Sequence, residues 1–221
     1  MNLETNKAMK EIITNLQNWQ VHKEDLSLMN DLLSKADFFK IDYEISDDNS
    51  ESYHLYPALE IFEDSEQNQS FQLVFYMISK NSDTKDFISD NKDNIETYIK
   101  KFNVIDKLLF QDTEITEEEA TIRKNRWSKD IKDWIFENEM FEVFDIPSED
   151  FNLTDEVKLQ GHFGMKEVQH EDNLSQTNFL PDIMIYHLNP DDSLISFFDM
   201  ARLSPPYGRQ RSEFALLDLL S

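Results

Sequence analysis

Five histidines are the residues of this chain best suited to metal binding or proton transfer: His22, His54, His162, His170 and His187. His162 and His170 lie in the run 162–172 (HFGMKEVQHED), which also contains three carboxylates. Imidazole and carboxylate groups are good ligands for zinc or iron(II). The eight-residue spacing matches neither HExxH nor a zinc finger, so we favour a solvated polar loop and keep His162 and His170 as candidate metal ligands. His54 and His187 lie in extended apolar segments, where we expect hydrogen-bonded core histidines.

The segment 201–211 (ARLSPPYGRQR) is the other local feature that suggests binding chemistry. It contains three of the five arginines, no acid and the only Pro-Pro pair of the chain. Arginines displayed on a rigid turn can hold a carboxylate or phosphate with paired hydrogen bonds. Arg202, Tyr207, Arg209 and Arg211 are therefore candidate binding residues. The alternative, which we favour, is that these arginines neutralise nearby acidic residues.

The residues that the chain lacks exclude several kinds of chemistry. It has no cysteine, which removes disulfides, thiolate metal sites and cysteine nucleophiles. Its three glycines cannot supply the closely spaced glycines of a dinucleotide-binding or phosphate-binding loop. No serine lies in a G-x-S-x-G motif. We therefore expect no cofactor, and the lack of a recognisable catalytic set favours a non-enzymatic protein over an enzyme.

Charge is the strongest compositional feature of the sequence. The 221 residues include 45 acids and 21 bases, which gives a formal net charge of −24. This charge repels nucleic acids and anionic membranes, so we expect neither as the main partner. The windows 41–79, 133–157 and 167–201 contain nine, nine and seven acids and no Lys or Arg. A solvated surface that promotes solubility is the simpler explanation, and a negative face that docks a basic protein is the functional one.

Hydrophobic spacing predicts the elements that must position these residues. Apolar residues three and four apart predict helices over 8–19, 26–36, 87–102 and 116–135, with a short helix within 212–220. Strands are expected at 40–46, 53–62, 70–79 and 140–146, and two hairpins pair 60–62 with 71–73 and 183–188 with 194–200. The polar stretch 148–178 receives no assignment. Because helices and strands fall in separate blocks, the sequence predicts an α+β fold with mainly antiparallel sheet.

The chain is expected to form a single α+β domain over residues 1–221, as one compact unit or as two packed subdomains that divide near 111–115. Its N-terminus lacks the apolar core of a signal peptide, and its most apolar stretch, 71–78, is too short to span a membrane. We therefore expect a soluble cytoplasmic protein. Lys outnumbers Arg by 16 to 5, which fits a bacterial source with an AT-rich genome. The sequence leaves the oligomeric state open.

Three segments together resemble a known group of proteins. They are ITEEEA with two following tryptophans at 115–134, FDIPSEDF at 144–151 and FDMARLSPPYG at 198–208. In this order they resemble a family of uncharacterised proteins common in Bacteroidetes. The resemblance implies a small α+β protein whose last strand runs into a Pro-Pro turn, and it implies no known activity.

These observations lead to one hypothesis and one alternative. The hypothesis is a non-enzymatic, acidic intracellular protein-binding module, such as an inhibitor or immunity-type partner of a basic protein. The alternative is a small-ligand-binding protein or hydrolase whose site combines the Arg202–Arg211 turn with His162 or His170. A flat, exposed position of Arg202 away from both histidines would count against the alternative.

Overall fold

The computed structural model describes residues 7–41, 50–63, 68–106, 118–151, 158–170, 173–198, 202–204 and 214–220. Its elements are α1 (Lys7–His22), α2 (Leu26–Lys35), β1 (Ala36–Ile41), β2 (Ser52–Glu63), β3 (Gln69–Ser79), α3 (Lys85–Asp90), η1 (Lys92–Thr97), β4 (Lys100–Asp106), α4 (Glu118–Glu137), β5 (Val143–Pro147), η2 (Ser148–Phe151), β6 (Lys158–His170), β7 (Asn173–Leu188), β8 (Leu194–Phe198), β9 (Arg202–Ser204) and α5 (Ala215–Asp218). The predicted α+β class with antiparallel sheet is confirmed. The suggested division near 111–115 lies outside the described residues.

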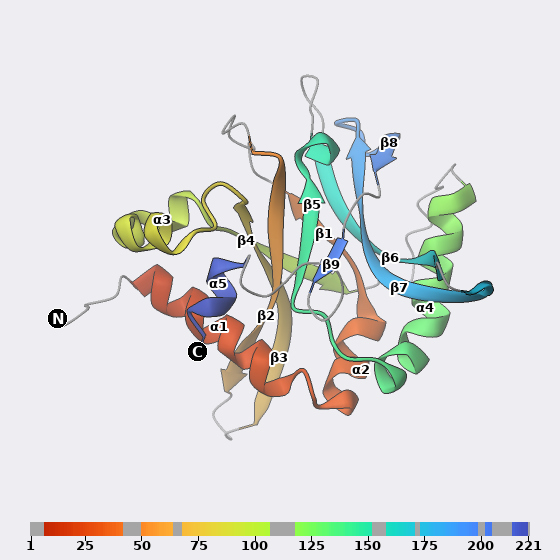
Figure 1. The fold of residues 1–221 in the computed structure, drawn as a ribbon, viewed down its shortest axis with the longest axis horizontal. Coiled ribbons are helices and arrows are strands. Elements are labelled where there is room, and N and C mark those ends of the chain that lie inside the picture. Colours follow the sequence, from red (N-terminus) through yellow and green to blue (C-terminus); the bar gives the residue numbers. More distant parts are fainter. Residues whose placement is uncertain are drawn as a thin grey trace.

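The strands form one strongly curved sheet with the order β8-β7-β6-β1-β4-β3-β2-β5-β9 (Figure 1). Every pairing among these strands is antiparallel. The two terminal strands of this order, β8 and β9, are consecutive in the chain and are separated only by residues 199–201. Four residue steps span at most about 14 Å, so one short segment pairs with β7 at one end of the order and with β5 at the other. The curvature therefore brings the two ends of the sheet together.

The concave face of the sheet holds the larger apolar core. Alternate residues of the strands point into it, and α2, α4 and the end of α1 add side chains to it. Aromatic rings dominate this core: Trp19, Phe39, Phe75, Phe102, Trp127, Phe141, Phe144 and Phe163. Gly161 allows the backbone of β6 to lie against the ring of Phe39, because a Cβ at position 161 would lie 2.1 Å from Cζ of that ring. The glycine is therefore needed for the phenylalanine to fill the centre of the sheet.

The convex face carries a second core under α1, α3 and α5. Residues of β2 and β3 that alternate with the inner set, such as Tyr56 and Val74, pack there against Leu16 of α1 and Phe214 before α5. In Figure 1 these three helices lie together on the left of the sheet. Because both faces are covered, β3 is buried on both sides over 73–79, as its unbroken apolar run predicts.

Two sequence predictions are wrong in this fold. The helix expected over 87–102 stops early, because α3 and η1 end by Thr97 and β4 begins at Lys100. The unassigned stretch 148–178 contains β6 and the first residues of β7, so the polar loop expected at 162–172 is instead mainly strand. In both places the strand pairs with β1, which is distant in sequence, and this pairing outweighs the local pattern.

Candidate functional site

The predicted arginine turn is only partly within the described structure. Tyr207, Arg209 and Arg211 lie outside the described residues, and of Arg202 the structure describes the backbone. Arg202 belongs to β9, where it lies opposite Asp145 of β5. Asp145 in turn lies opposite His54 of β2. The backbone therefore aligns Arg202 with His54, a histidine that sequence reasoning had assigned to the core.

The candidate metal pair is corrected by the strand assignment. His162 and His170 both belong to β6, and eight residues of extended strand separate them by about 26 Å. Two residues so far apart on one strand cannot bind the same ion. Among the side chains that the structure describes, no three His, Asp or Glu residues gather as metal ligands.

His162 is a buried strand residue, contrary to the solvated loop expected for it. Its ring is stacked between Tyr186, with centroids 4.0 Å apart, and Phe38, at 5.2 Å. Its Nε2 lies 3.0 Å from Oε1 of Gln160. Burial, and secondarily the charge of Lys124, lower the pKa of His162 well below its ordinary value. The imidazole is therefore neutral at pH 7.

His54 is the centre of a second buried polar group, which joins the C-terminal segment to the sheet. Its Nδ1 lies 2.5 Å from Oδ2 of Asp83, the same oxygen that accepts the hydroxyl of Tyr56. The other oxygen of Asp83 accepts the backbone N–H of Leu216 at 3.2 Å. Burial, and then Asp83, raise the pKa of Tyr56 well above its ordinary range. The expectation of a hydrogen-bonded core histidine at position 54 is confirmed.

This polar group does not form an accessible active site. The side chains of His54 and Asp83 are at most 1 % exposed, and Asp145, 4.0 Å from Nε2 of His54, is almost as buried. The ring of Phe214 packs on His54 with centroids 4.7 Å apart. The group therefore holds the C-terminal segment in place rather than presenting a base to substrate.

The windows without basic residues are partly neutralised in three dimensions. Five of their acids contact cations that come from elsewhere in the chain: Glu51 with Lys80, Glu60 with Lys101, Glu142 with Lys23, Asp182 with Arg123 and Lys166, and Asp192 with Lys158. The absence of Lys and Arg from a window therefore does not leave these five acids without a neighbouring cation. Surface charge has to be assessed from the fold.

Most of the large apolar side chains that are exposed in the described structure lie at one end of the molecule. Within the described part of the chain five such side chains are exposed, and four of them are Val21 (72 %), Phe136 (59 %), Phe62 (48 %) and Leu26 (36 %). They come from the ends of α1, α4 and β2 and the start of α2, and all four of these termini lie at the bottom of Figure 1. Aromatic contacts link these elements, because Trp19 and Trp134 both pack on Phe141 and His22 packs on Phe71.

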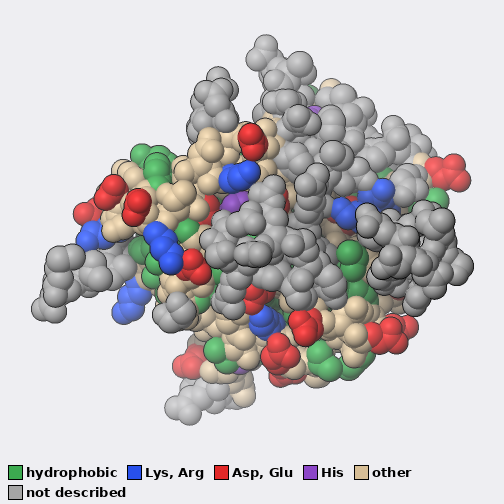
Figure 2. Space-filling model, in the orientation of Figure 1, with side chains coloured by type: hydrophobic (Ala, Val, Ile, Leu, Met, Phe, Trp, Pro, Cys, Tyr) green, Lys and Arg blue, Asp and Glu red, His purple; other side chains and the backbone are tan. Residues whose placement is uncertain are grey.

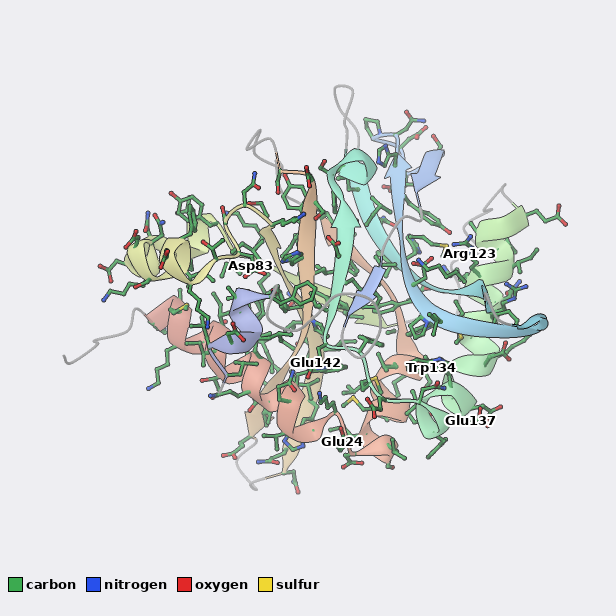
Figure 3. All side chains as sticks on the ribbon, viewed as in Figure 1. Glu24, Asp83, Arg123, Trp134, Glu137 and Glu142 are labelled. Atoms are coloured by element: carbon green, nitrogen blue, oxygen red, sulfur yellow. The ribbon has the colours of Figure 1, made fainter. Side chains whose placement is uncertain are left out.

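Acidic side chains surround this exposed apolar end. Segments 21–26 and 133–139 contain five acids (Glu24, Asp25, Asp133, Glu137 and Glu139) and one basic residue, Lys23. Nζ of Lys23 is bonded to Glu142 at 2.6 Å, so its charge is already engaged. Figure 2 shows red and green side chains side by side along the lower part of this face, and Figure 3 places Glu24 and Glu137 there. We call Val21, Glu24, Leu26, Phe62, Phe136 and Glu137 the acidic–apolar surface.

Rigid local structure positions this surface. Asp25 caps α2 by accepting the N–H groups of Ser27 and Leu28 at 3.1 Å, which fixes the turn that carries Glu24. Nε1 of Trp19 donates to the carbonyl of Phe141 at 3.2 Å and ties the end of α1 to the segment after α4. Sequence reasoning missed this surface. Its only local signal was Phe136, which falls outside the apolar stripe of α4 formed by Trp127, Ile131 and Trp134.

Comparison of the chain with protein-family models, with curated proteins and with solved structures gives no match. The resemblance to a Bacteroidetes family therefore stays a prediction. None of the helices in the described ranges has both the length and the apolar character that crossing a bilayer requires.

Proposed function

We propose that the protein is a non-enzymatic binding module that docks a basic protein through the acidic–apolar surface. The observation that carries this proposal is the gathering of four exposed apolar side chains at one end, beside the acids Glu24 and Glu137. An exposed apolar patch rimmed by charge is typical of a protein-interaction site. An inhibitor or immunity-type partner acting in a bacterial cytoplasm is the form of this function that the composition favours.

Two kinds of side chain have different roles in the proposed interface. Phe136 and Val21 supply apolar area that a partner can desolvate, which is where most binding energy arises. Glu24 and Glu137 supply negative charge at the rim, which speeds association with a cationic surface and excludes acidic competitors. This arrangement explains why a solvated surface alone is an insufficient account, because solubility does not require exposed Phe and Val.

The test compares two charge-reversal variants of equal size. Glu24→Lys/Glu137→Lys alters the acidic–apolar surface, and Asp86→Lys/Asp90→Lys changes the same number of charges on the exposed face of α3. Partners retained by the wild-type protein from lysate of its native host at low salt are identified and purified, and their affinities for each variant are measured by calorimetry. We expect the first variant to lose the partner and the second to retain it.

A third variant separates charge from apolar contact. Phe136→Ser leaves the net charge unchanged and should weaken binding about tenfold or more if the ring is an anchor. Retention of no basic protein at low salt would refute the proposal, as would equal retention by both charge variants. Circular dichroism and thermal melting of each variant confirm that the loss of binding is not a loss of fold.

A further inference from the structure

The contact between α4 and the sheet contains three cations, although the protein as a whole is strongly acidic. β1 pairs with β6 only as far as His162, and α4 packs beyond that point, where Arg123 contacts Gly164 and Trp127 stacks on Phe163. Three cations lie in this contact: Arg123 and Lys166, which both bind Asp182, and Lys124, which binds Asp37 at 2.9 Å. In these described ion pairs three cations contact two carboxylates, while His162 is neutral.

The His162 ring has no means of accommodating an added proton in this position. It is 4 % exposed and lies between two aromatic rings. Among the described residues Nδ1 has no hydrogen-bond partner. The charged or titratable groups that face it are Lys124 from α4, Asp37 and exposed Lys40 from β1, and Tyr186 from β7. Asp37 is already paired with Lys124, so protonation of His162 adds a further positive charge beside Lys124.

We infer that His162 is an acid-sensitive switch that releases the first half of α4 from β6 and β7. At neutral pH the uncharged ring stays stacked between Phe38 and Tyr186, close enough to Lys124 of α4 to be affected by its charge. In mild acid the proton is taken up only when α4 moves away and water reaches the ring, so acid favours the open state. This inference does not depend on the proposed docking function, because the residues involved lie outside the acidic–apolar surface.

The size of the effect follows from linkage between proton binding and opening. In the open state the ring titrates with its ordinary pKa of 6.5, while in the closed state it stays neutral well below that pH. The opening equilibrium therefore increases about twofold between high pH and pH 6.5, and about elevenfold by pH 5.5. Above pH 7.5 the opening of α4 should be independent of pH.

Hydrogen exchange of the full chain, read by mass spectrometry and corrected for intrinsic rates, tests this inference. Protection of the amides at 120–127 should fall about tenfold between pH 7.5 and 5.5 in the wild type and should stay constant in His162→Gln. His22→Gln at the end of α1 is the matched control and should behave as the wild type. Amides of β2 at 53–62 report global unfolding and should stay more strongly protected than those at 120–127 at every pH in all three proteins.

Two outcomes would overturn the inference. One is a fall in protection at 120–127 that is the same in the wild type and in His162→Gln. The other is protection at 120–127 that equals that at 53–62, which would indicate that α4 opens only by global unfolding. If His162→Gln does not fold, NMR titration of the wild-type imidazole replaces it. An ordinary titration of His162 near pH 6.5 with unchanged protection at 120–127 would then refute the switch.

Discussion

Removal of the Asp182 carboxylate is expected to produce the largest loss of stability at the α4 contact. The Asp182 side chain is completely buried, and its two oxygens bind Nη1 of Arg123 at 3.0 Å and Nζ of Lys166 at 3.2 Å. The variant Asp182→Ala leaves both cations in place without their shared anion. The destabilisation comes from the loss of this buried anion beside two cations rather than from the loss of packing.

The magnitude depends on how much water the two cations can regain. Removing one partner of a fully buried pair costs about 3–5 kcal/mol. The side chains of Arg123 and Lys166 are 15 % and 23 % exposed, so partial hydration places the expected loss near the lower limit. We therefore expect Asp182→Ala to lower the free energy of unfolding by about 3 kcal/mol. For a chain of this size that is a shift of about 1 M in the urea midpoint.

Urea unfolding followed by circular dichroism measures this loss, and a triple variant tests its cause. Replacing the whole ion group by apolar side chains, with Asp182→Leu, Arg123→Leu and Lys166→Met, should recover most of the stability because no unpaired charge remains. A loss below about 1 kcal/mol for Asp182→Ala would refute the reasoning. A triple variant no more stable than the single one would do the same.

Three further predictions concern the same core and its titratable groups. Gly161→Ala should lower the free energy of unfolding by about 1–3 kcal/mol, measured by urea unfolding, because its methyl group would overlap the ring of Phe39; an unchanged midpoint would contradict the packing described. Asp83→Ala removes the acceptor of three donors and should increase hydrogen exchange at 214–217 more than elsewhere, so uniform exchange would contradict its anchoring role. Burial lowers the pKa of His162 in the folded protein, so the unfolded chain binds the extra proton and stability falls as pH drops below 6.5. By pH 5.5 the wild type should lose about 1.4 kcal/mol more free energy of unfolding than His162→Gln. Parallel pH profiles of the two proteins in urea unfolding would contradict this.

Elements with a strong local period were predictable from the sequence. The apolar stripes of α1, α2 and α4 give these helices close to their observed bounds, and the pairing of 60–62 with 71–73 is found as Glu60 opposite Gln72 and Ile61 opposite Phe71. These segments succeed because the residues that decide their structure are neighbours in the chain. Burial then reinforces the local preference instead of opposing it.

The wrong predictions concern segments whose structure depends on residues distant in the sequence. Ile95, Ile99 and Phe102 have helical spacing, yet Phe102 pairs with Phe75 of β3 and enters the inner core as a strand residue. In β6 the period of two was present, but Gly161 stands where an apolar side chain would have marked the inner face. No local pattern shows that Phe39 fills that space.

Of the candidate site, only the negative charge could be predicted from the sequence. One acidic window, 133–157, contains Glu137 of this surface, but Glu24 lies outside all three windows. Lys80 and Lys101 reach Glu51 and Glu60 across the fold and cancel part of the charge of another window. What distinguishes the remaining acids is the exposed Phe and Val beside them. Exposure depends on how the ends of α1, α4 and β2 and the start of α2 are placed in the fold. The hydrophobic pattern of a single helix does not contain that information.

The pairing of residues 194–204 with both β7 and β5 has a consequence for how the protein is made. A chain still on the ribosome can pair its earlier strands, but β5 and β7 each keep an unsatisfied edge until β8 and β9 emerge. Such edges recruit strands from other molecules. Completion of the sheet therefore depends on β8 and β9, and a product truncated before residue 194 is expected to aggregate rather than persist as a smaller soluble protein.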